Sequence, residues 1–181
     1  MGVFCMKFDV MPVATERQIE EIEAVAVHAW RECYQGMYPE RQLTDMFETL
    51  QSKDAMRRLM REGQIYYMLL VDNQFAGYLS FRHNGNHIFL YSLYVKPDFR
   101  RKGIGRKSVE QFDKMLSGEE FHHVRKLKLK VPRDYRQAVK ILQHLDFQVT
   151  KAVDSETIHG YPLNEYVMER KIKRSQAEYG E

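Results

Sequence analysis

The residues that say most about the chemistry of this chain lie in one short segment, positions 95 to 107. An alternating apolar run ends at Val95 and Pro97, and a basic turn containing Gly103 and Gly105 follows. Apolar residues then recur at helical spacing from Ile104 onward, which predicts a helix. The first turn of a helix has unpaired N–H groups and a partial positive charge, and glycine lets the backbone approach a phosphate closely. The segment therefore predicts a site for a multiply anionic ligand. The basic residues that add to its charge are Arg100, Arg101, Lys102, Arg106 and Lys107.

This segment resembles the acyl-CoA signature of the GCN5-related N-acetyltransferases, the GNAT superfamily. That signature reads Val-x-Pro-x-x-(Arg/Gln)-x-x-Gly-x-(Gly/Ala), and the chain matches it at Val95, Pro97, Arg100, Gly103 and Gly105. An ordinary strand-to-helix turn would not need five matches at fixed spacing. A P-loop would continue with Gly-Lys-Ser/Thr, and a dinucleotide site would have a third glycine at position 108, which is a serine.

The resemblance implies acetyl-CoA as the cofactor. Its diphosphate is expected on the backbone amides of Arg101 to Arg106, and its pantetheine arm along the strand at Leu93 to Val95. The implied activity moves an acetyl group to a primary amine of a small molecule or peptide, by direct attack in a ternary complex. A non-catalytic acyl-CoA-binding module is the alternative. The expected cofactor-binding residues are Leu93, Tyr94, Val95, Arg100, Arg101, Lys102, Gly103, Ile104, Gly105 and Arg106.

The amine must lose a proton before it can attack. With a pKa of about 10.4, a lysine-like amine is neutral in only about one molecule in 2,500 at pH 7. Members of the superfamily often place a carboxylate on the strand equivalent to Leu90 to Val95, where this chain has Tyr91, Ser92 and Tyr94 instead. His159 and Glu165, near the last loop, are the candidate bases. His83 and His87 are more typical of exposed hairpin residues.

The second signature of the superfamily, Asn-x-x-Ala-x3-Tyr-x3-Gly-Phe, is altered here. Ala138 and Phe147 match, but Leu142 stands where the resemblance implies a tyrosine proton donor. Tyr135 and His144 are the candidate replacements, and Tyr135 is the one we assign as catalytic. Since a thiol with a pKa near 8.5 can leave as a thiolate, an acid is not essential. The altered signature favours the non-catalytic alternative.

Aromatic residues are the candidates for the acceptor site, because aromatic faces attract cationic amines. Trp30, Tyr34 and Tyr38 are expected between the first helices and the last hairpin, and Tyr91 on the strand before the signature. Core packing explains these residues equally well, Trp30 above all. The sequence offers no metal-ligand set.

The elements that must position these residues follow from hydrophobic periodicity. A capping box at Thr15–Gln18 starts a first helix, and a second helix starts at Pro39. Strands are expected over 64–71, 75–82, 87–95 and 124–131, a helix over 133–145, and a final pair of strands. The order β-α-α-β-β-β-α-β-α-β-β matches the GNAT arrangement over nearly the whole chain. The expected fold is therefore α+β, with a mixed, mostly antiparallel sheet of six to seven strands flanked by about four helices.

Composition sets the remaining expectations. The 181 residues suit one domain, which we assign to 1–173, followed by a polar tail at 174–181. The 44% apolar content is typical of a soluble protein, and no apolar run approaches the roughly 20 residues of a membrane span. Cys5 and Cys33 lack disulfide or metal spacing, which favours a reducing, cytoplasmic setting. The basic clusters lack interleaved aromatics, so nucleic acid is not expected as a partner; a homodimer is left open.

Overall fold

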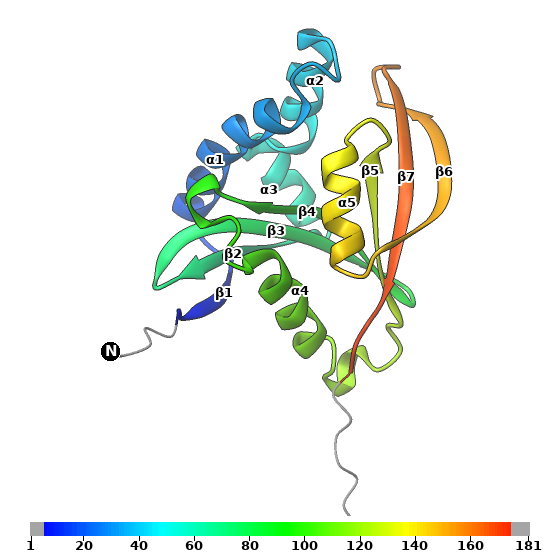
Figure 1. The fold of residues 1–181 in the computed structure, drawn as a ribbon. Coiled ribbons are helices and arrows are strands. Elements are labelled where there is room, and N and C mark those ends of the chain that lie inside the picture. The colour runs from blue at the N-terminus through cyan, green and yellow to red at the C-terminus, as the bar shows by residue number, and fades with distance from the viewer. Residues whose placement is uncertain (1–5, 175–181) are drawn as a thin grey trace, which may run out of the picture.

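The computed structural model describes residues 6–174, which form a seven-stranded sheet with helices on both faces (Figure 1). In spatial order the strands are β1 (Phe8–Pro12), β2 (Ile65–Val71), β3 (Gln74–Asn84), β4 (His87–Val95), β5 (Lys126–Pro132), β7 (Pro162–Lys171) and β6 (Gln148–Glu156). The helices are α1 (Glu16–Tyr34), α2 (Glu40–Leu50), α3 (Lys53–Arg61), α4 (Ile104–Met115) and α5 (Arg136–His144). The expected α+β class and the mixed, mostly antiparallel sheet are confirmed.

One strand pair distinguishes this sheet. All neighbouring strands run antiparallel except β4 and β5, which pair in parallel over only three positions, from His87 with Lys126 to Phe89 with Lys128. Beyond these positions the two strands diverge, and the sheet divides into a half made of β1 to β4 and a half made of β5, β7 and β6 (Figure 1). From Leu90 to Val95, β4 therefore has a strand partner, β3, on one side only.

The two faces of the sheet carry separate cores. Helices α4 and α5 cover one face, where Phe112 of α4 packs with Phe81 of β3 at a centroid distance of 4.7 Å. Helices α1 and α3 cover the other face, where Ile22 and Met56 are buried against Tyr78. At roughly 25 cal/mol per Å² of apolar surface removed from water, these contacts supply most of the stabilisation.

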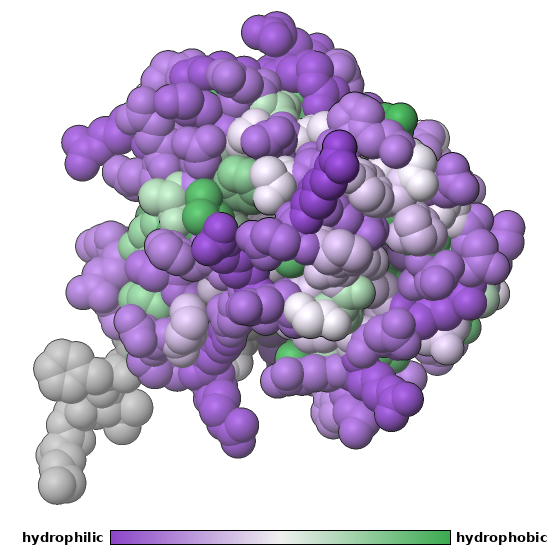
Figure 2. All heavy atoms as spheres, turned by 90° about the horizontal axis from the view of Figure 1, so that it is seen from above, coloured by the Kyte–Doolittle hydropathy of each residue, from purple (hydrophilic) through white to green (hydrophobic). Residues whose placement is uncertain are grey.

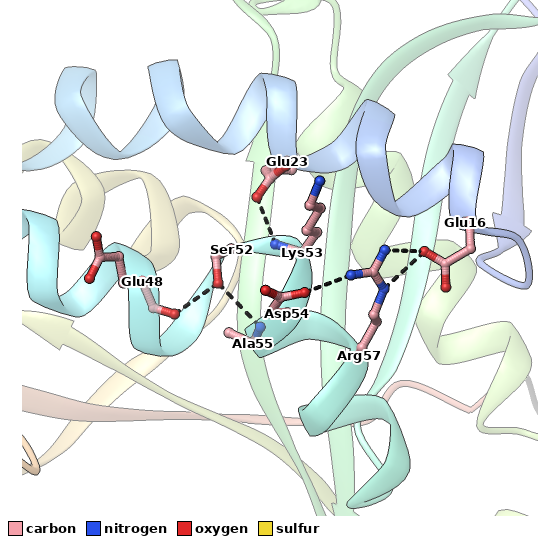
Figure 3. Close-up of polar contacts among 8 residues, drawn as sticks. All are labelled: Glu16, Glu23, Glu48, Ser52, Lys53, Asp54, Ala55 and Arg57. Carbon is pink, nitrogen blue, oxygen red and sulfur yellow. Dashed lines mark hydrogen bonds and ion pairs between the residues drawn. The ribbon is translucent and has the colours of Figure 1, made fainter.

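The helical segment between Pro39 and Gly63 divides at Ser52, which gives five helices where about four were expected. The Ser52 hydroxyl accepts a hydrogen bond from Ala55 N at 3.2 Å and so caps a new helix, α3 (Figure 3). Contacts from α1 fix the direction of that helix. Glu23 accepts a hydrogen bond from Lys53 N at 2.8 Å, and Glu16 accepts one from Arg57 Nε at 2.9 Å (Figure 3).

Helix α5 begins at Arg136, three residues later than its periodicity predicts. The cause is tertiary, because Arg133 N donates to Asn164 O at 3.0 Å and so continues the contact between β5 and β7 beyond Pro132. Tyr135 consequently occupies the N-cap position of α5, at the edge of the opening between β4 and β5.

A buried ion pair fastens the last strand to α4. Arg170 of β7 and Asp113 of α4 form two hydrogen bonds of 2.7 Å, with side chains only 4% and 7% exposed. Lys173 N adds a third bond to the same carboxylate at 3.2 Å. Arg174 then contacts Val124 O at 2.8 Å, and the rest of the expected tail lies outside the described residues.

The face seen from above is mainly hydrophilic, with apolar side chains in small separate groups (Figure 2). Within residues 6–174, no helix has the length and apolar character that crossing a membrane requires.

Candidate functional site

The site begins where β4 and β5 part. The register between β3 and β4 shifts just after the Ser80–Ser92 pair, because Tyr91 is an extra residue on β4, a β-bulge. The bulge lies two positions beyond Phe89, the last β4 residue that pairs with β5. Gln51 holds the strand next to it, donating from Nε2 to Ser92 Oγ at 3.2 Å. The bulge thus increases the local bend of β4 at the opening of the sheet.

Beyond the bulge, β4 presents different side chains to the two faces. Leu93 and Val95 pack on the α4 side, whereas Tyr94 packs on the α1 side. A small apolar hollow lies on the α4 side where the strands part. Its lining residues are Leu79, Leu90, Leu93, Ser108, Val109, Phe112 and Leu127.

The turn between β4 and α4 has a backbone shaped for anions. Arg101 and Gly103 both have positive φ, 59° and 75°, and flank Lys102. Such alternation turns successive N–H groups toward one side. The N–H groups from Arg101 to Arg106 donate no hydrogen bond to any acceptor within residues 6–174, and the ladder of α4 begins only at Lys107 N, which donates to Gly103 O at 3.0 Å. A Cβ at Gly103 would have no atom within 4 Å, so the space before these groups is open.

Two cations of this turn bond to backbone rather than to acids, although Arg106 adds to the effect of Lys173 in lowering the pKa of the Asp146 carboxyl. Lys102 Nζ donates to Asp98 O at 2.8 Å, and an Arg106 guanidinium N–H donates to His144 O at 2.6 Å. Both partners are backbone carbonyls. No carboxylate whose side chain the structure describes within residues 6–174 lies within ion-pair distance of Arg101, Lys102 or Arg106. Cations that form no such ion pair, beside unpaired N–H groups, favour a ligand with more than one negative charge.

Arg100, the signature arginine, is placed differently. Its guanidinium pairs with Glu32 of α1 and stacks on the Tyr94 ring at 5.3 Å. Its Nε also donates to Val95 O at 2.8 Å. The side chain therefore connects β4 to α1, while its expected neighbours in the turn remain open to a ligand.

Four of the predicted acceptor and catalytic residues meet on the α1 side of the opening. The ring of Tyr34, at the end of α1, lies 6.0 Å from the rings of both Tyr38 and Tyr135. Glu165 of β7 is near enough to raise the pKa of Tyr38, although burial is the larger cause of its rise to about 12. The structure thus brings three rings, those of Tyr34, Tyr38 and Tyr135, together with Glu165 from four different segments. We call these three tyrosines the aromatic group.

Tyr135 spans the opening between the two halves of the sheet. It packs against the α4-side core and approaches Tyr34 and Cys33 of α1. Burial and a hydrogen bond with the Cys33 thiol raise the pKa of Tyr135 well above its usual value of 10. Burial likewise raises the pKa of Cys33. Both groups therefore keep their protons at neutral pH. Leu142, in contrast, is half-buried against the core.

The two candidate bases, Glu165 and His159, contact different parts of the structure. Glu165 is 14% exposed and pairs with Lys130 of β5 at 3.3 Å. His159, in the loop between β6 and β7, pairs through Nδ1 with Asp45 of α2 and is half exposed. Gln42 of α2 also donates to Pro162 O at 3.2 Å, so this loop is fastened to α2. Glu165 therefore lies beside the aromatic group, whereas His159 helps to attach the β6–β7 loop to α2.

Two other predicted acceptor residues, Trp30 and Tyr91, lie outside the aromatic group. Trp30 contacts Tyr34 edge-on at 4.9 Å and is half-buried in α1. Tyr91, the bulge residue itself, is 50% exposed and lies beside Phe89 and Arg82.

Sequence reasoning missed Glu32, Cys33 and Gln51, which contact the signature arginine, Tyr135 and Ser92. The first two come directly before Tyr34 in sequence, at positions 32 and 33, but only the folded chain shows their partners.

Comparisons with known proteins agree with this geometry. A family model described as the acetyltransferase (GNAT) family matches residues 24–147. No curated protein matches the chain by sequence. Among solved structures, a PaiA N-acetyltransferase from Thermoplasma acidophilum in complex with coenzyme A has a TM-score of 0.70 at 19% identity, covering 91% of this chain and 99% of that one.

Two further acetyltransferase structures have the same fold. The ribosomal-protein-S18-alanine N-acetyltransferase of Escherichia coli has a TM-score of 0.62 at 16% identity, covering 97% of this chain and 100% of its own. The spermidine N-acetyltransferase of Vibrio cholerae, in complex with CoA and spermine, has a TM-score of 0.64 at 12% identity, covering 91% and 95%. With the family match spanning more than half of its length, this chain belongs to the GNAT acetyltransferase family.

Proposed function

We propose that this protein is an acetyl-CoA-dependent N-acetyltransferase that acetylates a primary amine by direct attack in a ternary complex. The observation that carries the proposal is the run of N–H groups from Arg101 to Arg106, which have no acceptor within residues 6–174, beside cations that form no ion pair with a described carboxylate. This arrangement fits a diphosphate better than a single carboxylate, because it offers several donors and several charges.

The residues present suit the cofactor. The turn would hold the diphosphate, and the free edge of β4 from Leu90 to Val95 would lie along the pantetheine arm. Bound acetyl-CoA supplies the acetyl thioester. The chain's part is to bind it, to orient an amine beside it and to manage the amine proton.

The aromatic group and Glu165 are the proposed acceptor side. Tyr34 and Tyr38 offer ring faces to an ammonium, and Glu165 offers a carboxylate. We assign to Glu165 the attraction of the ammonium and the acceptance of its proton. Tyr135 keeps its own proton and can donate a hydrogen bond. The setting we propose is the reducing cytoplasm that the free Cys33 suits.

A non-catalytic acyl-CoA-binding protein is the second candidate. The position of the common proton donor is Leu142, and Glu165 is already paired with Lys130. Both observations favour binding without transfer.

Release of free CoA from acetyl-CoA, followed with a panel of amines, separates the two candidates. The panel should include spermidine and a peptide with N-terminal alanine, since two of the similar structures are named for spermidine and for an alanine of a ribosomal protein. Lysine adds an amino-acid amine to the panel. We expect amine-dependent release and a product heavier by one acetyl group. Gly105→Val, where a Cβ meets only Leu145 at 3.9 Å, should stay folded and lose about ten-fold or more in acetyl-CoA affinity. Tight binding of acetyl-CoA without release for any amine would favour the second candidate.

A further inference from the structure

Glu32, near the end of α1, accepts hydrogen bonds from two residues that are distant in sequence. Arg100 donates to both of its carboxylate oxygens, with Nη2 at 2.9 Å from Oε2. The Tyr94 hydroxyl donates to the same Oε2 at 3.0 Å. These bonds lower the pKa of Glu32, Arg100 being the larger cause, so the carboxylate is ionised at neutral pH.

Each of the three nitrogens of the Arg100 guanidinium donates a hydrogen bond to the protein. Its two terminal nitrogens bond to Glu32, its Nε bonds to Val95 O at 2.8 Å, and its plane lies over the Tyr94 ring. Its charge is offset by Glu32. In this arrangement the arginine is not a phosphate ligand; it joins the end of β4 to α1.

Arg100 directly precedes the cofactor turn, so its connection to α1 affects the shape of that turn. Its own N–H donates to Pro97 O at 3.1 Å, and Arg101, with φ of 59°, follows directly. A fixed Arg100 therefore sets the direction from which the open N–H groups start. Two residues after Glu32, α1 carries Tyr34, the centre of the aromatic group. Glu32 is thus placed between the cofactor turn and the acceptor side.

We infer that Glu32 is a positioning residue that acts through Arg100: it holds the turn at Arg101 to Arg106 in its anion-binding shape and links that turn to the helix lining the acceptor side. The inference rests on the proposed function. Isolated exposed ion pairs contribute little. This one differs because a single carboxylate joins two residues from β4 and the following turn, through three hydrogen bonds.

A different role for Glu32 makes the opposite prediction. If the carboxylate merely masked Arg100 from the cofactor phosphates, its removal would free a guanidinium and strengthen CoA binding. The sign of the affinity change therefore separates positioning from masking.

The test measures the Kd of CoA by isothermal titration calorimetry at 25 °C for the wild type, Glu32→Gln, Arg100→Lys and the pair combined. Glu40→Gln is the matched control, because Glu40 pairs with Arg31 at 3.5 Å near the same end of α1. We expect Glu32→Gln and Arg100→Lys each to weaken binding about ten-fold, roughly the loss of one charge-assisted hydrogen bond. The combined variant should be no weaker than the worse single one, since both act on one connection. The control should match the wild type.

Steady-state kinetics adds a readout that lost stability alone would not move. The KM for acetyl-CoA should rise in Glu32→Gln, while kcat changes less than about two-fold. Tyr94→Phe, which removes only the third hydrogen bond, is the milder variant if Glu32→Gln does not fold, and it should weaken CoA binding in the same direction. Unchanged or tighter binding in the Glu32 or Tyr94 variants would overturn the inference alone. A wild type that does not bind CoA would overturn it together with the proposed function.

Discussion

At the scale of single residues, the site joins groups that retain their protons. Tyr34, Tyr38, Tyr135 and Cys33 all have pKa values raised by burial. A hydroxyl of this kind remains a hydrogen-bond donor throughout the physiological range, but it is a weaker acid than an exposed tyrosine. The chemistry at Tyr135 is therefore best examined through the pH dependence of turnover.

We expect Tyr135→Phe to lose less than ten-fold in turnover, because CoA can leave as a thiolate. For wild type and variant alike, the rate should rise through about pH 8 to 9 as more of the acceptor amine becomes neutral. Since the pKa of Tyr135 is raised, its ionisation cannot produce an alkaline limb below about pH 10. The measurement is kcat against pH with one good amine. A loss of about 10²-fold or more in the variant, the scale of a positioned acid, would instead make Tyr135 the proton donor.

At the scale of elements, β4 organises the site. Its bulge opens the sheet at Tyr91, and its last residues lead into the cofactor turn. Gly77 of the neighbouring strand β3 pairs with Val95 at this end of β4. A Cβ built on Gly77 would stand 2.1 Å from Tyr94 O and 3.0 Å from Val95 Cα, so only glycine fits between the strands here.

Gly77→Ala should displace the end of β4 and with it the cofactor turn. We expect a loss of about 1–3 kcal/mol in unfolding free energy, the usual range for overpacking, together with weaker CoA binding. Gly118→Ala is the control, because its Cβ would meet Met115 O at an ordinary 3.7 Å. Thermal melts and CoA titrations of both variants are the measurements. Equal behaviour of the two would show that the close approach at Gly77 is not required.

The helices and strands show how much of the structure could be predicted from the sequence. Local signals sufficed where local contacts decide the structure, and β4 occupies the predicted residues 87–95. The capping box at Thr15 is present as expected. The late start of α5 depends on the contact of Arg133 with Asn164, which no local pattern contains. The cofactor turn was predictable because it is contiguous, whereas the Glu32–Arg100 pair joins residues 68 positions apart.

At the scale of the whole molecule, the strand ladder between the two halves of the sheet is limited, within residues 6–174, to the short β4–β5 pairing, and helices help to hold the halves together. The Asp113–Arg170 pair provides one such connection, from α4 to the last strand. The pair is buried, so removing one partner leaves the other charge in a low-dielectric interior.

Asp113→Asn should lower the unfolding free energy by about 3–5 kcal/mol, the usual cost of an uncompensated buried charge. Glu21→Gln, which breaks an exposed pair with Arg17, should change it by less than about 0.5 kcal/mol. Urea denaturation of the wild type and both variants gives the comparison. A change below about 1 kcal/mol in Asp113→Asn would mean that the pair does not fasten the C-terminal half.

The most direct test of the central claim is a titration of the ¹⁵N-labelled protein with CoA, followed by the chemical shifts of its backbone amides. The claim is that the diphosphate binds to the N–H groups from Arg101 to Arg106, which have no acceptor within residues 6–174. We expect these amides to show the largest, saturable shifts, followed by those of β4 from Leu93 to Val95. If the largest shifts fell elsewhere, for example among the lysines of β5, or if no amide of the turn moved at saturating CoA, the account would be wrong.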